Sequence, residues 1–135
     1  MPNFKVKVVT HTKKVIEREA DYLRVRTTEG DLGILANHAP LVAELAMGQM
    51  EIEYKDKTKR DAYFVSGGFL EISNNEATVI ADELIAVTSI NIEKEEAQIE
   101  KIKNLIEKGS EKSFILEKKL KESQAKIELK NSYSK

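Results

Sequence analysis

The stretch Phe4-Lys5-Val6-Lys7-Val8 sets the fold class, because apolar and charged residues alternate along it. A period of two is typical of a half-buried β-strand, whose side chains point by turns to a core and to water. The same alternation returns in Leu23-Arg24-Val25-Arg26 and in Met50-Glu51-Ile52-Glu53-Tyr54. The first part of the chain is therefore predicted to be a β-domain.

Turn-forming residues separate the predicted strands. They stand at Glu29-Gly30-Asp31, Lys55-Asp56-Lys57, Ser66-Gly67-Gly68 and Ser73-Asn74-Asn75. Further extended runs are predicted at residues 77–81 and near residues 84–87. Short strands at this spacing are typical of a β-sandwich or a barrel.

The hydrophobic period changes at about residue 89, where an apolar stripe with helical spacing begins. The stripe is formed by Ile92, Ile99, Ile102 and Ile106. Asn91 is the predicted N-cap, and glutamates follow it where the helix dipole favours negative charge. Gly109-Ser110 interrupts the pattern, and Ser110 or Ser113 is expected to cap a second helix.

The second predicted helix has a narrow apolar stripe surrounded by lysines. The stripe consists of Leu116, Leu120 and Ile127. Two such helices joined by a short break predict an antiparallel hairpin. Because a narrow stripe buries little area, we expect the hairpin to be marginal and able to move without unfolding the β-domain. The predicted domains are residues 1–88 and 89–135.

Composition excludes several classes of function. The chain has no cysteine, which excludes disulfides and thiolate-bound metals. It has neither a signal-peptide core nor about 18 consecutive apolar residues, so no membrane insertion is predicted. The first part is slightly acidic and the tail slightly basic, without the clustered basic face of a nucleic-acid binder.

Catalytic, metal and cofactor sites are not predicted either. His11 and His38 are the only histidines, and a structural or interface role is preferred for both. The two glycines of Gly30-Asp31-Leu32-Gly33 do not form a phosphate loop, and Gly33 is expected to mark a bulge or a close backbone approach. Ser66-Gly67-Gly68 lacks the nucleophile motif and is expected to form a tight turn.

Two segments resemble the epsilon subunit of bacterial rotary ATP synthases. The first runs from Asp31 to Leu41, as Asp-Leu-Gly-Ile-Leu-Ala-Asn-His-Ala-Pro-Leu, with Gly48 seven residues later. The second is Ser66-Gly67-Gly68-Phe69-Leu70-Glu71-Ile72, and residues 79–82 fit the last core strand of that family. The resemblance covers the whole chain.

The resemblance implies a ten-stranded β-sandwich followed by a two-helix region. It implies a non-catalytic subunit of the central stalk of a proton- or sodium-translocating enzyme, peripheral on the cytoplasmic face of the bacterial plasma membrane. Glu29, Gly30 and Asp31 would face the ring of c subunits, and His38, Ala39 and Pro40 would face the gamma subunit. Polar groups in loops of a rigid scaffold suit such contacts.

The resemblance also implies regulation by the helices. They would lie against the β-domain, or extend along gamma toward the alpha and beta subunits and block ATP hydrolysis. The cations expected to hold the inhibited state on acidic partner surfaces are Lys118, Lys119, Lys121 and Lys126. The alternative reading, from another class of protein, is a free-standing adaptor or chaperone.

Two departures from the family pattern bear on shape and on ATP. Ala36 and Asn37 stand where the family usually has Pro and Gly, so a different loop shape is expected. Relatives that bind ATP carry Ile-Asp-x-x-Arg-Ala at the start of the first helix. Here Asn91, Lys94 and Glu95 replace its Asp, Arg and Ala. Lysine lacks the planar fork of arginine and Glu95 adds negative charge, so ATP binding is predicted to be weak or absent.

Overall fold

A computed structural model describes residues 2–12, 15–109 and 113–133 of the chain. By its internal contacts the chain divides into two compact units, Met1–Ala86 and Val87–Lys135. The first is called the β-unit here and the second the helical unit. The division falls two residues before the boundary that the sequence predicts.

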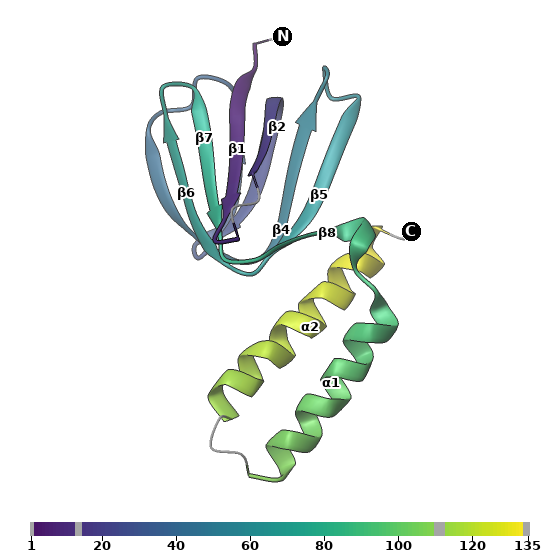
Figure 1. Cartoon of the computed structure of the whole chain (residues 1–135). Helices are drawn as coiled ribbons and strands as arrows, with labels where there is room; N and C mark the ends of the chain where they lie inside the picture. Colours follow the sequence, from purple (N-terminus) through teal and green to yellow (C-terminus); the bar gives the residue numbers. More distant parts are fainter. Residues whose placement is uncertain (1, 13–14, 110–112, 134–135) are drawn as a thin grey trace. The chain divides into compact units, whose positions relative to one another are not determined.

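The β-unit contains eight strands among its described residues (Figure 1). They are β1 (Phe4–Thr10), β2 (Val15–Thr27), β3 (Gly30–Ile34), β4 (Leu41–Tyr54), β5 (Lys59–Val65), β6 (Gly68–Ser73), β7 (Glu76–Ala81) and β8 (Leu84–Ala86). Their order is β3-β2-β1-β7-β6-β4-β5-β8, with an additional pairing between β2 and β4. That pairing brings the two long strands together and turns the sheet back on itself.

The family's count of ten strands is not confirmed, because β2 and β4 each run through two layers. The first half of β2 pairs with β1, and its second half pairs with β3 and β4. Likewise β4 pairs with β6 over Leu41–Leu45, and with β5 from Gly48 to Tyr54. Register shifts near Asp21 and after Val25 mark where β2 changes layer. Irregularities of this kind bend a strand and let it turn a sandwich corner.

The core lies between the two layers and uses the residues that the alternation places inward. Val6, Val8, Leu23, Met50 and Ile52 are all completely buried, while the charged residues between them stay at least partly exposed, with Glu51 as the exception. All three predicted strands are thus confirmed. The whole cluster, with the side chains packed against it, falls within residues 4–86. The β-unit therefore has a hydrophobic core of its own.

In the helical unit a 3₁₀ turn (η1, Val87–Ser89) leads into α1 (Ile92–Glu107). The predicted N-cap is confirmed, since the Asn91 side chain accepts a hydrogen bond from the backbone N–H of Lys94. At the other end Gly109 has a left-handed backbone with φ of 71° and donates its N–H to the carbonyl of Ile106. This is the C-terminal glycine that the sequence predicts.

The second helix, α2 (Ser113–Tyr133), runs antiparallel beside α1 (Figure 1). Ser113 is its first residue, and the alternative cap, Ser110, lies outside the described residues. Of the predicted apolar stripe of α1, Ile102 is buried and Ile92, Ile99 and Ile106 are half-buried. None of the described helices has the length and apolarity needed to span a membrane.

Candidate functional site

A row of apolar side chains crosses the outer surface of the β1-β7-β6 layer. Phe69 pairs with Ile80, Ile80 with Val9, and Val9 with Val15, so the four lie side by side across four strands. Phe69, Ile80 and Val15 are each more than half exposed. Val42 is 70% exposed and lies on the same face, because it pairs with Glu71 two positions after Phe69. These five residues are called the docking face.

A contiguous apolar patch of this kind marks an interaction surface more often than a plain solvated face. Sequence reasoning missed it, although one signal was present. Leu70 and Val79 point into the core, so their neighbours Phe69 and Ile80 have to point outward. Two paired strands that each carry an apolar residue at an outward-pointing position predict an exposed apolar patch, but only once the register between the strands is known.

The segment His38, Ala39 and Pro40 directly precedes β4 and thus adjoins Val42 on the docking face. The ring Nδ1 of His38 donates to the carbonyl oxygen of Ala39 at 2.7 Å. Asn37 takes a left-handed backbone with φ of 63°, which asparagine tolerates better than most residues. Asn37 therefore provides a left-handed residue in this loop without a glycine.

Asn75 holds this segment in place from another part of the β-unit. Its Oδ1 accepts the backbone N–H of Asn37 at 2.7 Å, and its Nδ2 donates to the carbonyl of Asn3 at 3.0 Å. One side chain in the β6–β7 turn therefore ties together the start of the chain and the segment around His38. Sequence reasoning read Asn75 only as a turn residue.

The second predicted contact begins in the turn between β2 and β3, where Glu29 lies, and continues into the first two residues of β3, Gly30 and Asp31. The Thr27 hydroxyl stabilises the turn by donating to the Gly30 carbonyl at 2.7 Å and accepting the N–H of Glu29 at 3.1 Å. Arg24 donates to Asp31 at 3.1 Å, and this hydrogen bond is the main cause that raises the pKa of the guanidinium. The carboxylate of Asp31 is thus already engaged, whereas Glu29 is exposed.

The ring of Tyr22 lies over Gly33, which is the close approach expected at this glycine. Both residues sit on the strands that carry the β2–β3 turn. A side chain at position 33 would collide with the ring, so the glycine lets the aromatic side chain cover the sheet there. Ser66 and Gly67 form a two-residue link between β5 and β6 that is bound to Glu83 and Asp82.

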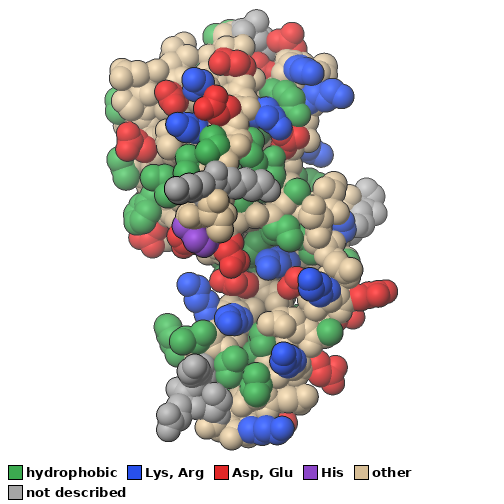
Figure 2. Space-filling view, viewed as in Figure 1, with side chains coloured by type: hydrophobic (Ala, Val, Ile, Leu, Met, Phe, Trp, Pro, Cys, Tyr) green, Lys and Arg blue, Asp and Glu red, His purple; other side chains and the backbone are tan. Residues whose placement is uncertain are grey.

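The predicted inhibitory lysines lie on one side of α2. Lys118, Lys119 and Lys121 are exposed and Lys126 is half-buried. At about 100° per residue, all four lie within one half of the helix surface, about 80° or more around the axis from the middle of the stripe formed by Leu116, Leu120 and Ile127. Lysine side chains stand out from the helical unit in Figure 2.

The degenerate ATP motif is occupied by contacts within the helical unit. Asn91 caps α1, as described above, and Lys94 is exposed. Glu95 Oε1 accepts a hydrogen bond from the hydroxyl of Ser123 at 3.0 Å.

His11, the other histidine of the chain, lies in the β-unit and donates through its ring Nδ1 to the carbonyl of Asp82 at 2.8 Å. Among the described residues, no group of three or more His, Cys, Asp or Glu is placed to hold a metal ion.

Comparisons with a protein family and with individual proteins point to the same kind of relative. The family described as ATP synthase, Delta/Epsilon chain, beta-sandwich domain matches residues 3–87. The sodium ion specific ATP synthase epsilon chain of Propionigenium modestum is 45% identical, over 98% of this chain and 97% of the relative. The ATP synthase epsilon chain of Halalkalibacterium halodurans is 34% identical over 84% of each chain.

A solved structure shows a similar fold over nearly the whole chain. The similar chain belongs to the OSCP/F1/c-ring structure of the Euglena gracilis mitochondrial ATP synthase, with a TM-score of 0.72 and 22% identity. The match covers 99% of this chain and 81% of that one. The likeness therefore includes the arrangement of β-sandwich followed by helices.

Proposed function

The chain belongs to the epsilon-chain family of ATP synthases, and on that premise we propose that it is the central-stalk subunit that joins gamma to the c-ring. In this family the chain is a non-catalytic subunit. The observation that carries the proposal is the docking face, since an apolar row on a rigid sheet suits a permanent protein interface.

The two loop contacts divide between the two partners. His38, Ala39 and Pro40 adjoin the docking face and would extend the contact with gamma. The turn Glu29–Asp31 belongs to a different layer and would reach the polar loops of the c-ring through Glu29. The subunit would thus be attached peripherally to the cytoplasmic face of the bacterial plasma membrane. The coupling ion, sodium in the name of the Propionigenium relative, would be selected by the c subunits.

The helical unit would act as the brake on ATP hydrolysis. When extended, α2 would present its lysine side to acidic surfaces of the alpha and beta subunits. Long-range attraction between opposite charges would steer the helix and then hold it. The separate core of the β-unit lets the subunit stay anchored while the helices move.

Deleting residues 89–135 is expected to raise ATP hydrolysis by the reconstituted complex by about fivefold or more, the usual lower range of coupling between sites. A full-length variant with alanine at Lys118, Lys119, Lys121 and Lys126 should give a large part of the same increase. Steady-state ATPase assays at matched subunit content measure both. Hydrolysis that stays at the level of the intact complex would exclude the brake while leaving the anchoring role untouched.

ATP is expected to bind the isolated subunit more weakly than about 1 mM. Asn91 is committed to the helix cap and Glu95 to Ser123, so neither is available to a nucleotide without losing a hydrogen bond. Isothermal titration calorimetry with ATP and Mg²⁺ measures the affinity. A dissociation constant in the micromolar range would contradict this expectation.

A further inference from the structure

Apolar burial specifies the position of α2 only loosely. Leu116, Leu120 and Ile127 are half-buried, but Phe114 and Ile115 are 82% and 52% exposed. The apolar residues are therefore spread around the helix instead of forming one deep stripe. A seam of this kind allows α2 to turn or slide with little loss of buried area.

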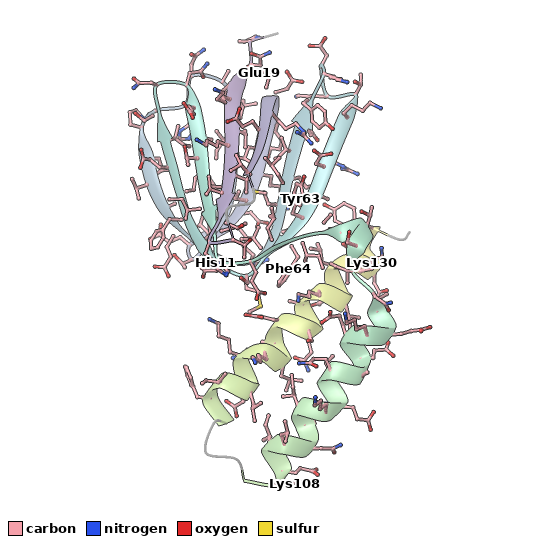
Figure 3. All side chains as sticks on the ribbon, viewed as in Figure 1. His11, Glu19, Tyr63, Phe64, Lys108 and Lys130 are labelled. Atoms are coloured by element: carbon pink, nitrogen blue, oxygen red, sulfur yellow. The ribbon has the colours of Figure 1, made fainter. Side chains whose placement is uncertain are left out.

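Two polar contacts define that position instead. Ser123 is only 4% exposed, and its hydroxyl donates to Glu95 on α1 at 3.0 Å. Lys130 donates through Nζ to the carbonyl of Val87 in η1 at 3.1 Å. We call these two hydrogen bonds the clasp. Figure 3 places Lys130 and Lys108 at opposite ends of the hairpin, so the second contact joins the two chain segments at its open end.

We propose that the clasp holds the hairpin closed, and that Glu95 and Ser123 are positioning residues that set how often α2 leaves α1. A single polar pair in an apolar seam fixes register because every shifted arrangement leaves a polar group without its partner. The bond is also reversible, since Glu95 is only half-buried and regains water when the helices separate. The link from opening to inhibition rests on the function proposed above.

The absence of cysteine in the chain permits a direct measurement of opening. Ala97→Cys and Gln124→Cys introduce spin labels at exposed positions, one on each helix. Pulsed electron resonance on the full-length subunit then gives the fraction of molecules with a long label distance. Ser123→Ala and Glu95→Ala should each raise the ratio of open to closed molecules on the order of fivefold, as expected for the loss of one typical intramolecular hydrogen bond.

Three further variants make the test specific. Glu95→Gln keeps an acceptor for Ser123 and should stay close to the parent chain. The double variant Glu95→Ala/Ser123→Ala should open no more than either single variant, because both remove the same bond. Ser132→Ala is the matched control, since the hydroxyl of Ser132 donates to the carbonyl of Leu129 within α2. Equal open fractions in Ser123→Ala, Glu95→Ala and Ser132→Ala would overturn the proposal.

The two proposals fail separately. The distance measurement needs neither gamma nor ATP, so it tests the clasp alone. In the reconstituted complex, Ser123→Ala is expected to lower ATP hydrolysis below that of the Ser132→Ala complex, because more molecules can extend α2. A variant that opens the hairpin without changing ATP hydrolysis would contradict the proposed inhibition by the helical unit. It would still support the role of the clasp in keeping the hairpin closed.

Discussion

Gly68→Ala is expected to lower the free energy of unfolding of the β-unit by about 3 kcal/mol or more. Gly68 opens β6 with φ of 137°, a conformation that side chains rarely adopt. A Cβ atom there would run into the backbone carbonyl of Ile80 on the neighbouring strand. The strand cannot move away, because Gly68 is paired with both Ala81 and Leu45.

Gly30→Ala is the matched control for this variant. Gly30 also has a positive φ, of 119°, but a Cβ there meets no atom within 4 Å. Its cost is therefore backbone strain alone, about 1–2 kcal/mol. Urea unfolding followed by tyrosine fluorescence measures both, since Tyr22, Tyr54 and Tyr63 lie in the β-unit. Equal loss of stability in the two variants would show that the clash with Ile80 is not the cause.

Phe69→Asp combined with Ile80→Asp is expected to weaken binding to an epsilon-free stalk complex by about 100-fold or more. Large apolar side chains at the centre of an interface each contribute about 2 kcal/mol or more when they are hot spots. Here the exchange also buries a charge against an apolar partner surface. The core should stay intact, because both side chains are more than half exposed, although two carboxylates directly opposite each other on β6 and β7 lower the stability of the pair by a modest amount.

Leu105→Asp provides the comparison for this loss of binding. It makes the same kind of exchange at a 40% exposed position of α1, outside the β-unit. Binding is measured by titrating labelled subunit into the stalk complex, and circular dichroism checks that each variant is folded. If Phe69→Asp/Ile80→Asp binds as tightly as Leu105→Asp, the docking face is not the stalk interface.

Much of the architecture followed from local patterns. The alternation around Val6, Leu23 and Ile52 predicted the strands, and the caps at Asn91 and Gly109 predicted both ends of the first helix. These features depend on residues close together in the chain, so the sequence specifies them directly. The number of strands could not be predicted from local patterns. It depends on where β2 and β4 bend, which is decided by pairing with strands far away in sequence.

The candidate site divides in the same way. Glu29, His38 and the lysines of α2 were found from local sequence and resemblance, and their contacts with partners remain predictions. The docking face and the support from Asn75 needed the fold, because their members come from segments up to 72 residues apart. A hydrogen bond such as the one from Asn75 to Asn3 leaves no periodic trace in the chain.

The β-then-α order, the absence of cysteine chemistry and the boundaries of α1 were thus determined by the amino-acid sequence alone, since each reflects a local preference or a composition. Tertiary structure decided which outward side chains of β1, β2, β6 and β7 become neighbours. It also decided that Ser123 meets Glu95 across the hairpin. Both depend on register between distant segments, which packing selects and local patterns do not encode.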